Sequence, residues 1–209
     1  MPVGVDVPVD AFGRKTNPPP LRGSVWTSEK PTTETRFRGV LLVPDPSKPK
    51  GAYEKLGGEL SDAGFNTLLI EPRKNESQPQ RTLIEDIQSG VGFMKTDKRV
   101  GAVKVLVVAN GAAANAAAHY AAAGKQMSLI VDGVVLLSPD QEVKRMKLSD
   151  AIADMGNVPL LLASTKGDVL ALAKKCRNAP CRPLKSADDG KTVVAKQAIL
   201  EFLLRPHGQ

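Results

Sequence analysis

Residues 103–123 have the sequence VKVLVVANGAAANAAAHYAAA, and the fold is inferred outward from this stretch. Val103–Val108 (VKVLVV) is rich in β-branched and apolar residues and is typical of a strand, whereas the alanine-rich part from about Ala112 to Ala123 is typical of a helix. Only the short segment 109–111 (ANG) separates them, and its small residues allow the strand to turn sharply into the helix. The stretch therefore predicts a buried strand that leads directly into a closely packed helix.

The same alternation continues on both sides of this stretch. Further strands are predicted at Gly39–Val43, Phe65–Ile70, Val131–Leu137, Pro159–Ala163 and Cys181–Lys185. Further helices are predicted at Tyr53–Ala63, Leu83–Met94, Leu148–Met155, Val169–Cys176 and Val193–Leu204. Continuously apolar strands that alternate with helices are typical of a parallel sheet buried on both faces. We therefore predict an α/β fold: a mostly parallel sheet covered by helices on both faces, with ligands at the carboxyl ends of the strands.

The first 22 residues differ from the rest of the chain. They contain five prolines and few periodic apolar positions, so residues 1–22 are predicted to form an extended arm before a single domain, 23–209. Short edge strands are expected around Ser24–Thr27 and Thr33–Phe37. The beginning lacks the basic-then-apolar pattern of a signal peptide, which leaves a cytoplasmic protein or a processed form as alternatives. No apolar run is long enough to predict a membrane span.

The charge balance bears on partners. The chain has 29 basic and 22 acidic residues, a net charge of +7, which favours another protein or an acidic ligand as partner. Nucleic acid is disfavoured because the basic residues are scattered and not interleaved with aromatic ones. Lys48, Lys50 and Lys55, with Arg73 and Lys74 as neighbours, predict either a solvated basic rim or a surface for an acidic ligand. A homo-oligomer joined through the apolar strands and the arm is a further alternative.

Cys176 and Cys181 lie close together in the segment CRNAPC. Their spacing allows a short disulfide loop in an oxidising compartment, and it equally allows two reduced thiols. A disulfide would imply a periplasmic or exported protein, and reduced thiols would fit the cytoplasm. No second Cys or His pair accompanies them, so no metal is predicted. Because the chain also lacks dinucleotide-binding and Walker patterns, no cofactor is predicted.

Several segments together resemble the α/β-hydrolase superfamily over about four fifths of the chain. They are GVLLVPD (39–45), LGGELSDAGFNTLLIEPR (56–73), VLVVANGAAANAAAHYAA (105–122), VDGVVLLSP (131–139), VPLLLASTKGDV (158–169) and PLKSADDG (183–190). The chain looks like a compact, lidless and degenerate member, similar to uncharacterised bacterial hydrolase-like proteins that are often exported. The resemblance implies a nucleophile elbow at 109–113, an oxyanion loop after Val43, a triad acid after the strand at 159–163 and a histidine loop at 186–190.

The catalytic positions that this resemblance implies lack the usual residues. A nucleophile elbow has the pattern G-x-S-x-G, and here Gly111 stands at the serine position. The triad acid corresponds to Asp168. The histidine position falls at Asp188 or Asp189, and a carboxylate is a far weaker base than imidazole.

The oxyanion loop is altered as well. It opens with Pro44 and Asp45, where proline has no N–H to donate and an aspartate would repel a developing oxyanion. With nucleophile, base and oxyanion donors missing together, we predict a non-catalytic protein of this fold that binds or scaffolds a partner. The alternative is an esterase-like hydrolase with relocated catalytic residues, in which Ser138 or Ser164 would be the displaced nucleophile.

The candidate binding residues are those expected at the carboxyl edge of the sheet: Asp45, Asn110, Gly111, Ser138, Ser164 and Asp168. Each also has a structural interpretation. Gly111 would be a packing glycine or an anion site at a helix N-terminus, and Asn110 and Asn115 would be capping or exposed residues. Asp168 would cap the helix at Val169 or bind a cation together with Asp188 and Asp189. Ser138 and Ser164 would be turn serines, and His119 a half-buried helix residue.

Overall fold

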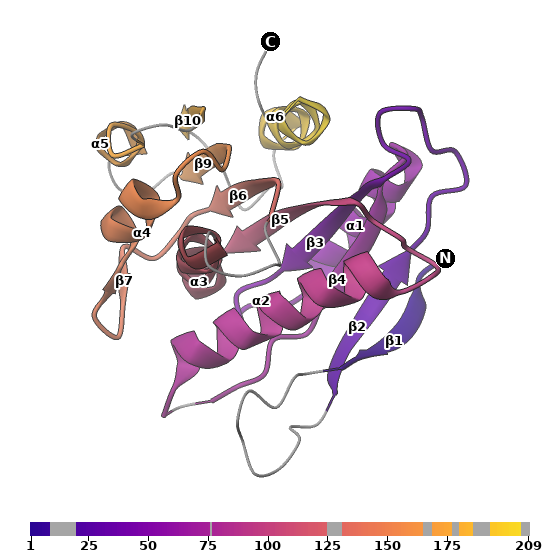
Figure 1. Ribbon diagram of the computed structural model, residues 1–209, viewed down its shortest axis with the longest axis horizontal. Coiled ribbons are helices and arrows are strands. Elements are labelled where there is room, and N and C mark those ends of the chain that lie inside the picture. The colour runs from indigo at the N-terminus through magenta and orange to yellow at the C-terminus, as the bar shows by residue number, and fades with distance from the viewer. Residues whose placement is uncertain are drawn as a thin grey trace.

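A computed structural model describes residues 1–8, 20–75, 77–124, 131–164, 169–176, 180–185 and 193–205. Its centre is an eight-stranded sheet in the order β1-β2-β4-β3-β5-β6-β9-β10 (Figure 1). The strands are β1 (Val3–Val7), β2 (Leu21–Trp26), β3 (Arg38–Val43), β4 (Asn66–Ile70), β5 (Lys104–Asn110), β6 (Gly133–Leu137), β9 (Leu160–Ser164) and β10 (Cys181–Lys185). A separate hairpin consists of β7 (Glu142–Val143) and β8 (Met146–Lys147).

Helices connect most of these strands. They are α1 (Gly51–Asp62), α2 (Pro79–Thr96), α3 (Gly111–Ala123), α4 (Leu148–Asp154), α5 (Val169–Ala173) and α6 (Val193–Leu204). The six strands β4, β3, β5, β6, β9 and β10 pair in parallel. At the β4 side of the sheet, β2 pairs antiparallel with β4, and β1 pairs antiparallel with β2. The predicted mostly parallel α/β sheet is therefore confirmed. Among the described residues, no helix combines the length and apolar character that crossing a membrane requires.

Each face of the sheet has its own apolar core. In β3, Leu41 and Val43 pack under α2, α3, α4 and α5, whereas Val40 and Leu42 point to the face covered by α1 and α6 (Figure 1). This alternation is the period-two geometry of a strand buried on both sides. Five alanines of α3 are completely or almost completely buried, namely Ala113, Ala114, Ala116, Ala117 and Ala118. Their short side chains let α3 approach the middle of the sheet closely, which sets where its first turn lies.

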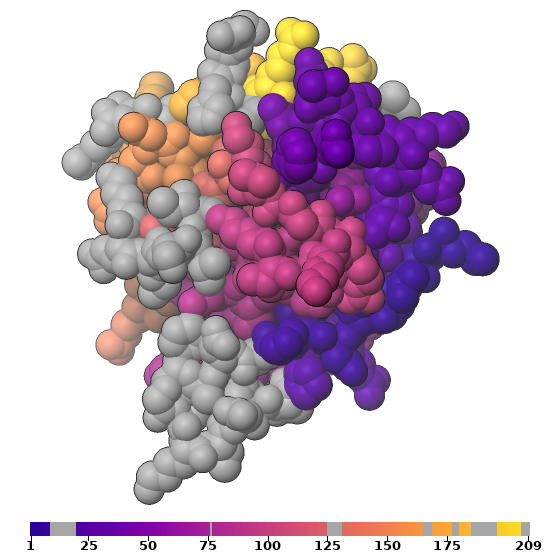
Figure 2. Space-filling model, turned by 45° about the vertical axis from the view of Figure 1, so that its right-hand side comes forward, coloured from indigo at the N-terminus to yellow at the C-terminus, as the bar shows by residue number. Residues whose placement is uncertain are grey.

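Two segments near the N-terminus differ from expectation. Val3–Val7, inside the expected arm, forms the edge strand β1, and the first residues lie on the surface beside α2 (Figure 2). The strand expected at Thr33–Phe37 is wrong, because this segment is a turn. The hydroxyl of Thr35 accepts a hydrogen bond from the Thr32 N–H at 2.9 Å, and the Thr35 N–H donates to the Thr32 hydroxyl at 3.2 Å. Such local side-chain bonds compete with strand pairing.

Candidate functional site

The sharp turn predicted at residues 109–111 is present where β5 meets α3. β5 ends at Asn110, α3 begins at Gly111, and Gly111 has a φ of +57°. This left-handed backbone suits glycine, because a Cβ makes it strained. Since α3 begins without a connecting loop, its first N–H groups lie at the carboxyl edge of the sheet. The turn has the sharp strand-to-helix geometry that the resemblance predicts for a nucleophile elbow, with a glycine at the position of the serine.

Another residue fills the space that a side chain at position 111 would occupy. Asp45 follows β3 and is only 8% exposed. A Cβ added to Gly111 would lie 1.9 Å from Asp45 Oδ2 and 2.9 Å from Asp45 Cγ. The carboxylate therefore stands where the serine side chain of an elbow would stand. This close approach explains the glycine independently of its φ angle.

Local hydrogen bonds hold the Asp45 carboxylate in this orientation. The backbone N–H and the hydroxyl of Ser47 both donate to Asp45 Oδ1, at 2.9 and 2.6 Å. The Lys48 N–H donates to the Asp45 carbonyl oxygen at 2.9 Å and closes the turn. With Oδ1 held by Ser47, Oδ2 is the oxygen that faces the elbow. The positive end of the α3 dipole favours an anion at this place.

Lys48 brings a cation to the same edge. Its Nζ donates to Asn110 Oδ1 at 3.2 Å, which links the loop after β3 to the last residue of β5. Asn110 is completely buried and has no side-chain capping bond, so neither the capping nor the exposed interpretation holds for it. The altered loop after β3 therefore supplies an ammonium group beside the elbow, in addition to the carboxylate.

Asn115, one turn further along α3, is structural. It is completely buried, and its amide donates to the carbonyl oxygens of Asp140 and Met146 at 3.0 and 3.2 Å. Its Oδ1 accepts a hydrogen bond from Gln80 at 2.7 Å. These bonds join α3 to α2 and to the β7–β8 hairpin. The capping or exposed interpretation of Asn115 is wrong.

The two candidate serines lie at the ends of the next strands of the sheet. Ser138 follows β6 with a φ of +42°, which is uncommon for a residue other than glycine. Its N–H donates to Ala163 O at 2.7 Å, and the Asp140 N–H donates to Gly111 O at 3.2 Å, so this loop lies against the elbow. Ser164 is the last residue of β9 and is buried, so it is not a turn serine.

The remaining expected triad positions fall elsewhere. Asp168, Asp188, Asp189 and His207 lie outside the described residues. His119 is half-buried, as expected, and lies eight residues into α3, about 12 Å along the helix axis from Gly111. Burial lowers its pKa, and the backbone of Lys147 before α4 partly counteracts this. His119 therefore belongs to the contact between α3 and α4 and is not a base at the elbow.

A pocket of about 330 Å³ opens next to the Asp45 turn. Its wall is built from the loop after β3 and the loop after β4 together with the start of α2: Pro46, Ser47, Arg73, Lys74, Asn75, Pro79 and Leu83. Ser47 belongs both to this wall and to the turn that holds Asp45. The pocket combines apolar side chains with two cationic ones, in the size range of small-ligand sites.

A buried ion pair positions the far wall of this pocket. Arg73 Nε lies 2.6 Å from Asp86 Oδ1, the Arg73 N–H donates to Asp86 Oδ2 at 2.8 Å, and Arg73 Nη2 lies 3.5 Å from Glu85. Burial of Asp86 outweighs the nearby guanidinium and raises the pKa of its carboxyl group to about 6. The sequence indicated Arg73 as part of a basic rim, but it did not indicate this partner.

Other cations of the predicted basic rim are paired with acids. Lys50 pairs with Glu54 and Glu71, and Lys55 with Glu59.

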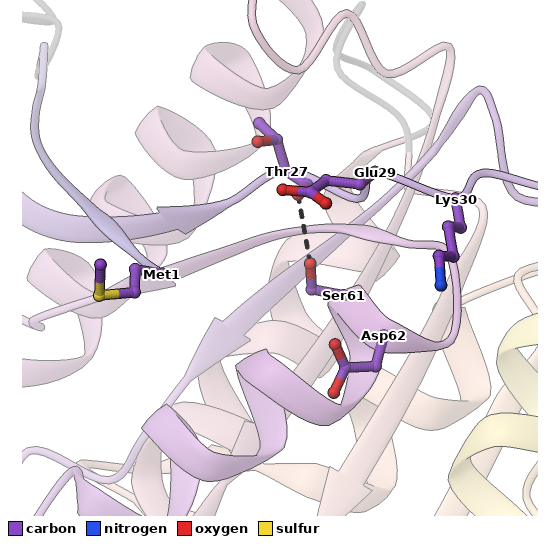
Figure 3. A pocket seen from close by; sticks show the side chains of 6 residues that line it. All are labelled: Met1, Thr27, Glu29, Lys30, Ser61 and Asp62. Atoms are coloured by element: carbon purple, nitrogen blue, oxygen red, sulfur yellow. Dashed lines mark hydrogen bonds between the residues drawn. The ribbon is translucent and has the colours of Figure 1, made fainter.

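A second hollow lies away from the elbow (Figure 3). It is lined by Met1, Thr27, Glu29, Lys30, Ser61 and Asp62. Within it, the Ser61 hydroxyl donates a hydrogen bond to Thr27 O at 3.3 Å. This hollow lies at the amino edge of the sheet, where β2 and α1 end. We therefore place the candidate site at the elbow and the adjoining pocket.

No family model and no curated protein matches this sequence. Solved structures do match in fold. DcsB, solved in complex with its substrate analogue, aligns with a TM-score of 0.77 at 11% identity and covers 99% of this chain and 100% of DcsB. The Pyrococcus furiosus esterase Pf2001 aligns with a TM-score of 0.71 at 14% identity, over 100% of this chain and 91% of the esterase.

Est1E from Butyrivibrio proteoclasticus aligns with a TM-score of 0.68 at 12% identity, over 96% of this chain and 98% of Est1E. The chain has the α/β-hydrolase fold. At these identities the likeness concerns the fold, and it covers nearly the whole length of each protein.

The prediction of a non-catalytic binding or scaffolding protein is wrong on this comparison. Several of the similar structures are named as esterases, which favours the alternative of a hydrolase with relocated catalytic residues. The prediction rested on the missing side chain at position 111. The Asp45 carboxylate, from the loop after β3, occupies the space where that side chain would lie.

Proposed function

We propose that this chain is a hydrolase of small esters in which Asp45 takes the role of the missing serine. The observation that carries the proposal is the position of Asp45 Oδ2, 1.9 Å from the place of a Cβ on Gly111. Carboxylates act as nucleophiles in several enzyme classes, and a carboxylate needs no separate base to remove a proton before it attacks. A carboxylate at the elbow therefore compensates for the loss of both serine and histidine.

The reaction takes two steps. Asp45 Oδ2 attacks the ester carbonyl carbon, the bond from that carbon to the alkoxy oxygen breaks, and an acyl-aspartyl anhydride forms. The departing alkoxide takes a proton from the Lys48 ammonium. Water then adds to the anhydride, releases the acid and the Asp45 carboxylate, and returns a proton to Lys48. The net change is ester plus water to acid plus alcohol.

Lys48 has a second role in this scheme. The loop after β3 begins with Pro44, which has no N–H to donate to an oxyanion, and Asp45, whose negative charge would repel one. The Lys48 ammonium, held on Asn110 Oδ1 at 3.2 Å, supplies positive charge at the same edge. Charge placed in advance where the oxyanion develops is among the largest contributions to enzymatic acyl transfer.

The adjoining pocket limits the substrate. Its volume of about 330 Å³ suits a small acyl or alcohol group, and Pro46, Pro79 and Leu83 provide apolar contacts. Lys74 lines the same pocket, which favours a substrate that carries an anionic group, whereas Arg73 is already paired with Asp86 and Glu85. A short ester with a carboxylate is the substrate class that these walls fit best.

The experiment compares hydrolysis of activated short-chain esters, with and without a carboxylate, by the wild type and by Asp45→Asn. Asparagine keeps the size of the side chain but not its nucleophilic charge, so we expect kcat/KM to fall about a hundredfold or more. Asp62→Asn is the matched control, because Asp62 is exposed and belongs to the hollow at the amino edge. Circular dichroism spectra of the variants establish that each is folded.

Ser138→Ala is the decisive second variant, because the strained φ of Ser138 marks it as the alternative nucleophile. We expect it to retain the wild-type rate. The proposal is overturned if Ser138→Ala abolishes turnover while Asp45→Asn preserves it. It is equally overturned if the folded wild type does not exceed the buffer rate on any ester of the panel.

A further inference from the structure

We infer that Cys176 and Cys181 are a reversible redox pair, which closes into an intrachain disulfide when it meets a small-molecule disulfide. The two cysteines approach to 3.0 Å as free thiols, and both are partly exposed. A disulfide requires a separation of about 2.05 Å between the sulfurs. A contraction of about an ångström is therefore enough to form the bond, and both groups are accessible to a small oxidant.

The fold brings the two thiols together from different elements. Cys176 lies just after α5, where its N–H donates to Ala173 O at 3.1 Å, and Cys181 is the first residue of the edge strand β10. Both side chains pack against the apolar core under α2 to α5. The core contacts hold the pair in place, so closing the bond would tie α5 to the edge of the sheet.

The two cysteines lie near the amino-terminal ends of the parallel strands, whereas the elbow lies at their carboxyl ends. Cys181 pairs with Leu160 at the start of β9, whereas Ser164 is at the end of the same strand. Four steps along a strand cover about 13 Å. The inference therefore does not depend on the proposed hydrolase function, and oxidation of the pair is expected to leave ester hydrolysis unchanged.

The hydrogen bond between the thiols makes them unequal. The Cys181 S–H donates to the Cys176 sulfur, which lowers the pKa of Cys176 and raises the pKa of Cys181. Since the thiolate is the attacking form, Cys176 is the first nucleophile and Cys181 the resolving thiol.

The exchange balances without any further reactant. The Cys176 thiolate attacks one sulfur of the small disulfide and releases one small thiolate. Cys181 then gives its proton to this thiolate, attacks the Cys176 sulfur and releases the second small thiolate, which takes up the proton that Cys176 had given to water. Two protein thiols and one small disulfide thus become one protein disulfide and two small thiols.

The test uses the full chain and oxidised glutathione. After incubation and acid quenching, we expect the wild type to lose both free thiols and the mass of two hydrogen atoms, with a peptide that links Cys176 to Cys181. Reduced dithiothreitol should restore both thiols. Cys181→Ser should instead accumulate glutathione on Cys176, because no resolving thiol remains, and Cys176→Ser should react more slowly.

The inference is overturned if the folded wild type keeps both thiols under conditions in which Cys181→Ser is glutathionylated. It is also overturned if glutathione remains attached to the wild type, because a pair at this distance should resolve the mixed disulfide. The two serine variants differ from the wild type by one atom each, and their far-UV spectra verify the fold.

Discussion

A carboxylate oxygen in the space above a glycine is the feature on which the candidate site depends. The sequence allowed Gly111 to be placed at the elbow, because small residues between an apolar strand and an alanine helix leave few alternatives. It also placed Asp45 in the neighbouring loop. It could not show that the Asp45 side chain enters the elbow, because this depends on the register of β3 against β5, where Val43 pairs with Ala109. Tertiary pairing, not local pattern, brings these residues together.

This contact predicts a thermodynamic coupling between positions 111 and 45. Gly111→Ala should lower the free energy of unfolding by about 2–4 kcal/mol, from the left-handed φ and from overlap with Asp45 Oδ2. In an Asp45→Ala background the overlap disappears, and the same substitution should cost only about 1–2 kcal/mol. Urea unfolding of the four proteins measures the cycle. Equal costs in both backgrounds would show that the carboxylate does not occupy the elbow.

At the scale of elements, most strands and helices of the main sheet were predictable from their apolar patterns, whereas the two-residue strands were not. β5 and α3 lie within two residues of their predicted bounds. β7 and β8 have two residues each and no apolar run, so no pattern indicated them. An element can be predicted from the sequence when it is long enough, and buried enough on one side, to show a periodic pattern of apolar residues.

Helix α2 offers a matched pair of glycines that tests its packing. A Cβ on Gly90 would lie 2.8 Å from Leu41 Cδ1, in the completely buried core, whereas a Cβ on Gly92 would meet nothing within 4 Å. Both substitutions to alanine improve helix propensity. We therefore expect Gly92→Ala to stabilise the protein by about 0.5–1 kcal/mol and Gly90→Ala to destabilise it by about 1–2 kcal/mol. Thermal and urea unfolding measure both.

The opposite signs at Gly90 and Gly92 are the informative result. A gain of stability from both alanines would mean that α2 does not lie against β3 as described. A loss from both would mean that the exposed side of α2 also contacts another part of the chain.

At the scale of the whole molecule, the order of elements predicted the fold, whereas the function was predicted wrongly. The alternation of strands and helices reflects which positions are buried, and many residues of each element contribute to that pattern. A reactive group needs one atom in one place, and any of several loops at the carboxyl edge can supply it. A missing residue at one position therefore says little until the neighbouring loops are placed.

The buried Arg73–Asp86 pair gives the whole molecule a characteristic pH dependence. The pKa of Asp86 is raised from 3.8 to about 6 by burial, so between these values the folded protein binds a proton more tightly than the unfolded chain does. The contribution of Asp86 to the free energy of unfolding must then fall as pH rises from about 4 to about 6, and remain level above that range. The shift corresponds to about 3 kcal/mol. This is opposite to the usual behaviour of a paired carboxylate, because here desolvation outweighs the attraction of Arg73.

Comparison with Asp86→Asn isolates this effect from the other carboxylates. Urea unfolding at a series of pH values should show the free energy of unfolding of the wild type, relative to Asp86→Asn, decreasing by about 3 kcal/mol between pH 4 and pH 6. Asparagine cannot titrate, so whatever pH dependence it retains belongs to other groups. A difference that increases over this interval would mean that Arg73 stabilises the Asp86 carboxylate more than burial penalises it, and the Asp86 pKa would then lie below 3.8. The wall that Arg73 forms in the pocket beside the Asp45 turn would in that case be held by a strong ion pair, and acid would loosen it.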